Sequence, residues 1–152
     1  MRTKKNQKGF SLIELLIVVA IILIIAAIAI PNLLRSRMAA NEASAVGSLR
    51  TLNTAAVQYN TTYGIGFPAA LTDLGPAATA TSTAADLIDS VLASGTKSGY
   101  TFTWSGGGDT YNITGAPTTV GTTGQRTFYT DQSGVIRGDA TGTADANSTP
   151  IS

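Results

Sequence analysis

The chain has 152 residues, which is enough for one domain of modest size. It contains neither cysteine nor histidine, and this excludes disulfides, thiolate metal sites, a cysteine nucleophile and a Ser-His-Asp triad. The formal net charge is +1, but four of the ten basic residues come before Phe10, and residues 10–152 carry a side-chain net charge of −3. We therefore expect no basic surface for nucleic acid beyond the first nine residues.

A long apolar run follows a short basic leader. The leader is residues 1–9, MRTKKNQKG, and residues 15–30 are sixteen consecutive apolar residues. Only Ser11 and Glu14 interrupt the twenty-one positions that begin at Phe10. About 20 helical residues cross the hydrocarbon core of a bilayer, so the run is just long enough to span a membrane, with the basic leader on the cytoplasmic side.

The same residues admit a second interpretation, an ordinary secretory signal peptide. Ala27-Ile28-Ala29 would then be the small-residue cleavage site. The apolar region of such a peptide is normally shorter than this run, and an acidic residue at its start is unusual. The membrane-spanning interpretation is therefore preferred.

Glu14 is the one carboxylate in the apolar run. A carboxylate near the membrane core costs roughly 2.5–3.5 kcal/mol, so Glu14 should either stay hydrated near the interface or have a charged partner. Cleavage between Gly9 and Phe10 would give Phe10 a free amine, one helical turn from Glu14 in the same chain and able to pair with a neighbouring chain. In a bundle of identical helices, such a pair would fix the axial register.

Residues 8–15, KGFSLIEL, followed by an apolar helix with Pro31, resemble the class III leader of type IV pilins and the related pseudopilins. The resemblance covers about the first sixty residues. It implies cleavage after Gly9 by a membrane prepilin peptidase, N-methylation of Phe10, and use of Glu14 in subunit assembly. It also implies a single-pass precursor in the bacterial inner membrane that becomes an extracellular filament, with the peptidase, the assembly machinery and membrane lipid as partners.

The helix is expected to continue past Pro31, with a kink there, because residues 32–63 contain no further proline and one glycine. A single apolar stripe follows the helical period in this segment. The stripe consists of Val46, Leu49, Leu52, Ala56, Tyr59 and Tyr63. A helix from about Ser11 to Tyr63 would be roughly 80 Å long. A domain this small cannot bury such a helix, so its first half must lie in lipid or against other copies.

The composition changes at Gly64, and fourteen of the sixteen glycines and four of the five prolines lie from this residue onward. Residues 64–83 are predicted to form a loop anchored by three apolar residues. These are Phe67, Leu71 and Leu74. Residues 84–93 are predicted to form a short helix with Gly95 as its cap. Its inward side would carry Leu87, Ile88 and Val91.

Alternating residues then predict four antiparallel strands, over residues 100–104, 110–114, 126–130 and 134–137. One face would be apolar, with Tyr100, Phe102, Trp104, Tyr111 and Ile113. Residues 105–109 would form a turn, 118–124 a flexible connection and 138–152 a loosely held tail. The apolar stripe of the helix can cover this sheet.

The predicted fold class is therefore α+β, with a long kinked N-terminal helix whose C-terminal half packs on a small antiparallel sheet. Residues 1–9 would be the cleaved leader, 10–31 the transmembrane and assembly half-helix, 32–63 the amphipathic half-helix, and 64–152 the globular head.

The head offers few groups that suggest chemistry. Ser94 and Lys97 have the spacing of a Ser/Lys acyl-enzyme motif, but the companion motifs are absent, and we expect no catalytic residue. Asp139, Asp145 and Asn147 are oxygen ligands of the kind that calcium prefers, without the spacing of an EF-hand. Major pseudopilins carry calcium near the C-terminus, and Asp139 and Asp145 are the candidates by that resemblance; no cofactor is otherwise expected.

The sequence thus predicts a non-enzymatic structural subunit of a type IV pilus-like surface filament, a homo-oligomer. One alternative is a pseudopilin of a type II secretion system. The other is a membrane-anchored or secreted binding domain whose N-terminus merely resembles the leader.

Overall fold

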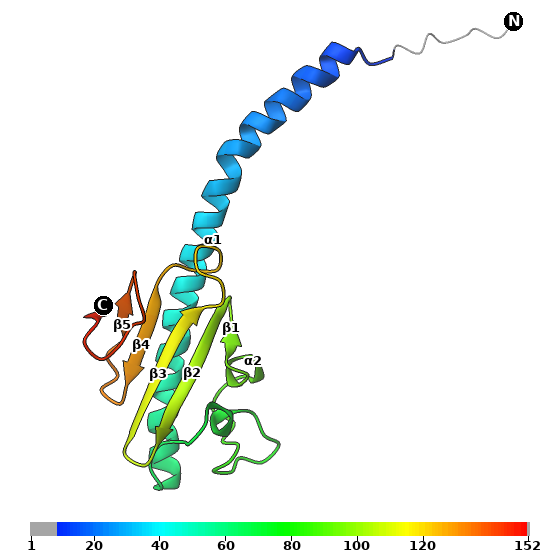
Figure 1. Ribbon diagram of the computed structural model, residues 1–152. Coiled ribbons are helices and arrows are strands. Elements are labelled where there is room, and N and C mark those ends of the chain that lie inside the picture. Colours follow the sequence, from blue (N-terminus) through cyan, green and yellow to red (C-terminus); the bar gives the residue numbers. More distant parts are fainter. Residues whose placement is uncertain (1–8, 152) are drawn as a thin grey trace, which may run out of the picture. The chain divides into compact units, whose positions relative to one another are not determined.

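The computed structural model describes residues 9–151 (Figure 1). The predictions for residues 1–8 lie outside the described part. Three helices come first, α1 (Leu12–Tyr63), the 3-10 helix η1 (Leu71–Leu74) and the one-turn α2 (Ser90–Ala93). Six strands follow, β1 (Thr96–Lys97), β2 (Tyr100–Gly107), β3 (Thr110–Pro117), β4 (Thr127–Asp131), β5 (Arg137–Asp139) and β6 (Thr149–Pro150). The α+β class is confirmed.

The chain divides into two compact units, one that ends at Ser36 and one that runs from Arg37 to Ser152. Helix α1 contributes to both, and its observed bounds confirm the helix predicted from about Ser11 to Tyr63. Pro31 lies inside the helix and does not end it. The kink at Pro31 stays a prediction.

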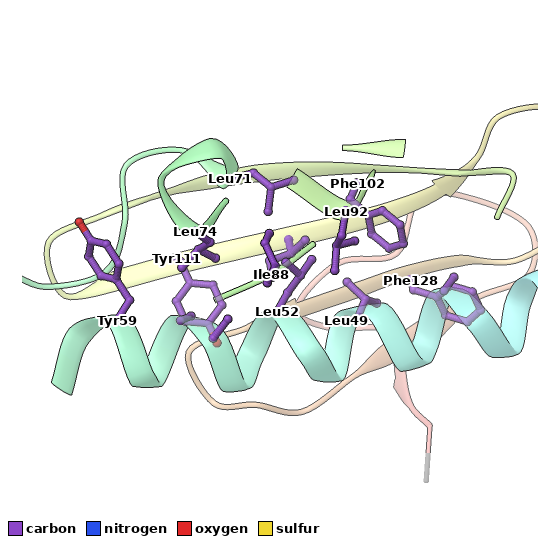
Figure 2. Packing of buried hydrophobic residues seen from close by; sticks show 14 of the residues in the cluster. Leu49, Leu52, Tyr59, Leu71, Leu74, Ile88, Leu92, Phe102, Tyr111 and Phe128 are labelled. Carbon is purple, nitrogen blue, oxygen red and sulfur yellow. The ribbon is translucent and has the colours of Figure 1, made fainter. Parts of the chain in front are cut away.

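The C-terminal part of α1 buries one face against the sheet of the second unit (Figure 2). The buried residues recur every three or four positions, as an amphipathic helix requires. They are Ala45, Ser48, Leu49, Leu52, Ala55, Ala56 and Tyr59. This confirms the centre of the predicted stripe, while Val46 and Tyr63 are only partly buried at its edges.

The six strands form one antiparallel sheet in the order β1-β2-β3-β4-β5-β6, each strand beside its neighbour in the chain. One face carries buried Tyr100, Phe102, Tyr111, Ile113 and Phe128, which pack on α1 and the η1–α2 segment. In Figure 1, α1 runs behind the strands of this second unit. The predicted aromatic face is confirmed, although Trp104 is only partly buried, and Phe128 joins it.

The strand prediction was wrong in number and in several boundaries. Strands β2 and β3 each end three residues later than predicted, and of the predicted strand 134–137 only Arg137 lies in a strand, β5. Six strands form instead of four, because the short β1 and β6 extend the sheet at its edges. The predicted turn 105–109 is mostly strand, since the ladder runs to the Gly107–Thr110 pair and only Gly108 and Asp109 form the turn. Gly108 has φ +66°, a left-handed conformation that glycine adopts without steric cost.

The predicted helix over residues 84–93 was wrong apart from its last turn. Asp86 has φ +54°, and the amides of Ala85, Leu87 and Ile88 donate to carbonyls of residues 73–74 rather than to helical partners. Helix α2 begins only after Asp89, whose carboxylate accepts from the Leu92 amide at 2.9 Å and caps the helix.

This change of backbone also changes which side chains point inward. Val91 was predicted to be buried and is 53% exposed, whereas Leu92 is buried in its place. Ile88 is buried, as predicted, and Leu87 is partly buried. Gly95 follows α2 with φ +80°, as predicted for the cap.

The connection over residues 118–124 was predicted to be flexible, but helix α1 holds it. The Asn41 side-chain amide donates to the Thr123 carbonyl at 2.8 Å. The Glu42 carboxylate accepts from the amides of Gln125 and Arg126 at 2.9 and 3.1 Å. These contacts give hydrogen-bond partners to backbone groups that lie outside the sheet. They also fix the position of the chain where it enters β4.

The tail was predicted to be loosely held, and this was also wrong. Strand β6 pairs with β5, the Ile151 amide donates to the Ile136 carbonyl at 2.9 Å, and Ala144 is buried. Local turns order the segment between these strands, because the Asp139 and Asp145 carboxylates accept backbone amides two and three residues further on. The tail is therefore ordered by strand pairing and local turns, without a periodic pattern of apolar residues.

Leu52 lies at the centre of the core that α1 forms with the sheet and is 0% exposed (Figure 2). We expect Leu52→Ala to lower the free energy of unfolding by about 2–5 kcal/mol, because it leaves a cavity between packed layers. Urea unfolding followed by the fluorescence of Trp104, with the apolar half-helix in detergent micelles, measures this loss. The matched control is Val57→Ala on the exposed side of α1, with an expected effect within about 0.5 kcal/mol. Equal effects at both positions would contradict the packing.

Asn53 joins α1 to the sheet through polar contacts. Its side-chain nitrogen donates to the Thr130 hydroxyl at 2.9 Å, and its oxygen accepts from the Tyr111 hydroxyl at 3.0 Å. Thr130 is fully buried. A satisfied polar group inside an apolar contact favours one alignment of the helix over its neighbours, because a shifted helix would leave these groups unpaired.

Two buried tyrosines make the head sensitive to alkaline pH. Burial raises the pKa of Tyr100 and of Tyr111 to about 12, with a smaller contribution from Glu42 and Asp131 respectively. Between pH 10 and 12 the unfolded chain loses these phenolic protons while the folded chain keeps them. The free energy of unfolding should therefore fall as pH rises through this window. Urea unfolding at several pH values measures the slope, and Tyr111→Phe should make it shallower; an unchanged slope would contradict the assignment.

Candidate functional site

The candidate site is the exposed apolar surface of the first unit. Seventeen large hydrophobic residues between Phe10 and Leu34 are exposed. Within α1, an 18-residue window is long and apolar enough to cross a membrane, and 0% of it is buried. Soluble monomers rarely expose contiguous apolar patches larger than a few hundred Å². This surface therefore has to be covered by lipid or by another chain.

The sequence makes this segment helical and apolar on all sides. Residues 15–30 contain no glycine or proline, and no polar residue marks a solvent-facing side. A helix that is hydrophobic all round is either buried in a large core or lies in a membrane. Every backbone donor and acceptor within such a helix is paired internally, as the hydrocarbon environment requires.

Glu14 lies at the start of α1 and makes a contact that the sequence prediction missed. Its Oε2 atom accepts from the backbone amide of Ser11 at 2.8 Å. Ser11 immediately precedes the first helical residue, so the Ser11-x-x-Glu14 spacing is one half of a capping box, and this spacing could have revealed the contact. A carboxylate in the first turn also interacts favourably with the helix dipole.

Gly9 and Phe10 lie before the first helical turn, and both are exposed. Phe10 is 87% exposed, and a Cβ atom built on Gly9 would have no neighbour within 4 Å. The peptide bond between them thus lies outside helix α1 and joins two exposed residues, as access by a protease requires. The structure brings Gly9, Phe10 and Glu14 to the same end of α1 and places Pro31 about five turns further on.

The candidate groups of the head do not form a catalytic arrangement. The Ser94 hydroxyl donates to the Val91 carbonyl at 2.6 Å, whereas the Lys97 ammonium pairs with Asp89 at 2.8 Å. Backbone amides of Thr141 and Gly142 lower the pKa of Asp139, and the Asn147 amide with the Ser148 hydroxyl lowers that of Asp145. Within residues 9–151, no group of three or more acidic, histidine or cysteine side chains could hold a metal ion.

Comparison with known proteins finds similarity for the N-terminal segment. Residues 4–30 match the family model described as the prokaryotic N-terminal methylation motif. The chain is 66% identical over 38 residues to the type IV wide pilus major component PilA4 of Thermus thermophilus, which covers 25% of this chain and 29% of that protein. It is 48% identical over 54 residues to the type IV major pilin protein PilA of Myxococcus xanthus, covering 36% and 24%.

The chain thus carries the methylation motif of type IV prepilin leaders and is related in sequence to type IV major pilins. The matches span about a quarter of the length of these curated relatives. The matched motif contains Gly9, Phe10 and Glu14, the same residues that the structure gathers at the exposed end of the apolar helix.

Proposed function

We propose that this chain is a structural subunit of a type IV pilus-like filament. It is held in the inner membrane as a single-pass precursor, and it polymerises through the apolar half of α1. The observation that carries the proposal is the exposed apolar half of α1, most of which lies within the matched methylation motif. The names of the two related proteins, both major pilus components, agree with it.

Maturation is proposed to cut the chain between Gly9 and Phe10 and to methylate the new amine of Phe10. Both residues lie in the matched motif and are exposed outside the helix. Cleavage removes a leader with four basic residues. The leader's charge opposes transfer of the N-terminus across the membrane, so its removal leaves an end that can move into a helix bundle.

Assembly is proposed to transfer the apolar half-helix from lipid into a bundle of like helices. Lipid tails are as apolar as these side chains, so the hydrophobic gain is small, and close packing and polar contacts decide the arrangement. The exposed surface carries one charged group between Phe10 and Leu34, namely Glu14. It is therefore the group best suited to select one axial register.

Glu14 can serve the helix cap and a neighbouring subunit together. Its Oε2 atom is engaged by Ser11, while Oε1 has no hydrogen-bond partner among residues 9–151. The cap holds the carboxylate at the helix end, and the remaining oxygen is available to the Phe10 amine of an adjacent chain. A charge-assisted contact of this kind is stronger than a neutral hydrogen bond and is strengthened further where water is excluded.

The proposal is tested by fractionation of cells that produce the protein. We expect one pool in the inner membrane that resists alkaline carbonate extraction, and a second pool in filaments sheared from the cell surface. Full recovery from the periplasm or the medium as a soluble monomer would contradict the proposal. Recovery in the membrane alone, under conditions in which the same cells assemble other pili, would favour the membrane-anchored binding domain.

A further inference from the structure

An open hollow of about 350 Å³ lies on the face of the sheet that α1 does not cover. Strands β2, β3 and β4 form its floor, close to the β2–β3 turn. Its volume falls within the range of about 300–1,000 Å³ that is usual for small-molecule sites. None of the functions proposed above uses this hollow.

The strand register places three polar side chains in one row across the hollow. Ser105 on β2 is opposite Asn112 on β3, and Asn112 is opposite Asp131 on β4. Neighbouring strands are about 4.8 Å apart, so the row presents polar groups at regular spacing on one face. Tyr129 precedes Asp131 by two residues and therefore lies on the same face.

These side chains have unused hydrogen-bonding groups. Within residues 9–151, no hydrogen-bond partner is present for the Ser105 hydroxyl, the Asn112 and Gln132 amides or the Tyr129 hydroxyl. Asp131 uses Oδ1 to accept from the Ser133 amide at 2.9 Å and leaves Oδ2 unused. The hollow thus offers both donors and acceptors, and the amide, hydroxyl and ring groups are fixed on strands or at a strand end.

The chemistry of the lining restricts the ligand. Among the residues that line the hollow, Asp131 is the one charged side chain and none is cationic, which disfavours an anion. The mostly polar lining disfavours a lipid or another apolar ligand. A single carboxylate is also too few charged ligands for a metal ion.

We propose that this hollow binds a neutral saccharide. A pyranose presents hydroxyl groups that both donate and accept, which matches the Ser105, Asn112 and Asp131 row. The half-buried ring of Tyr129 flanks the row, and aromatic rings bind an apolar face while their polar edge makes hydrogen bonds. Because strands carry the groups, binding costs little ordering entropy.

Two glycines shape the β2–β3 hairpin, Gly107 on the face of the hollow and Gly106 on the opposite face. Gly107 lies on the same face as Ser105 and has no side chain to fill the space beside it. At Gly106 an added Cβ would come within 2.7 Å of the Tyr111 Cβ and 2.9 Å of the Trp104 indole nitrogen. A larger residue there would displace the aromatic pair beneath the hairpin.

The test uses the full chain in detergent micelles on an array of immobilised neutral and acidic oligosaccharides. The methyl glycosides of the sugars that are bound are then titrated and followed by NMR shifts of residues 105, 112, 129 and 131. Asn112→Leu and Tyr129→Leu remove the polar groups and should weaken binding at least tenfold. Thr101→Leu is the matched control, because Thr101 is exposed on the same face of β2 outside the hollow. Trp104 fluorescence verifies that each variant is folded.

Binding of neutral sugars, lost in both hollow variants and kept in Thr101→Leu, would support the proposal. No binding on the array, binding restricted to acidic sugars, or binding unchanged in the variants would overturn it. It would also be overturned if no sugar binds and the same variants abolish filament formation, since the hollow would then be a contact between subunits. The sugar-binding measurements use unassembled chain, so their outcome does not depend on the filament proposal.

Discussion

Placing a lysine at the centre of the apolar half-helix, Ile21→Lys, is expected to reduce the yield of sheared filaments more than tenfold while the chain stays in the membrane. Ile21 is exposed in the isolated chain and lies midway along the apolar run. On insertion scales the exchange costs about 3–4 kcal/mol. In lipid, a lysine lowers this cost by extending its stem toward the interface.

Inside a bundle of apolar helices, the lysine of Ile21→Lys cannot reach the interface, because its ammonium would be enclosed without a partner. The penalty therefore falls on assembly more than on insertion. The matched control is Ile21→Leu, which conserves volume and should assemble at close to the normal yield. Filament yield per membrane-bound chain, measured by quantitative immunoblotting, is the readout. Normal filaments from the lysine variant would show that this surface is not enclosed by other copies.

Removing the carboxylate with Glu14→Ala is expected to reduce filament yield by at least tenfold. The alanine loses both contacts inferred for Glu14, the cap on the Ser11 amide at 2.8 Å and the charge available to a neighbouring Phe10 amine. Loss of a cap costs about 1 kcal/mol, whereas loss of one partner of an enclosed charge pair costs about 3–5 kcal/mol. The charge pair should therefore dominate the effect.

Glu14→Gln separates the two contacts. A glutamine can accept from the Ser11 amide as glutamate does, since both residues complete a capping box, but it carries no charge. If the charge selects the register, Glu14→Gln should assemble as poorly as Glu14→Ala. Near-normal assembly of the glutamine variant would show that the cap alone accounts for the requirement, and the proposed pairing with Phe10 would be wrong.

The helix and the sheet could be predicted from sequence because their residues follow a period. The buried positions from Leu49 to Tyr59 recur at three and four residues, and the aromatic residues of β2 alternate. The predicted inward position of Val91 failed for a reason that the sequence does not display. Asp86 adopts a positive φ where its own amide and those of its neighbours donate to carbonyls of residues 73–75, contacts that depend on the folded chain.

The sequence analysis also missed segments that are ordered although their apolar residues follow no periodic pattern. In the tail, the carboxylates of Asp139 and Asp145 accept hydrogen bonds from nearby backbone amides and so hold the chain in turns. From the sequence, these two residues were interpreted as candidate calcium ligands instead. Asn53 is polar in the middle of an apolar stripe, and only its contacts with Tyr111 and Thr130 explain it. The hollow at Asn112 required the register of three strands, which a single sequence does not supply.

The N-terminal end of the apolar helix was the part of the candidate site that could be predicted most completely from the sequence. Gly9, Phe10 and Glu14 lie within six residues of one another, so their proximity follows from the sequence itself. The Ser11 cap on Glu14 lies within the same segment. It adds a local role for this carboxylate to the contact between subunits.

Mass spectrometry of the N-terminus of the chain recovered from sheared filaments tests the proposed maturation and mode of assembly together. We expect a chain that begins at Phe10 with a methylated amine, since residues 4–30 match the N-terminal methylation motif. A chain that begins at Ile30, after Ala27-Ile28-Ala29, would have lost the apolar helix. That result would contradict both the maturation and the mode of assembly.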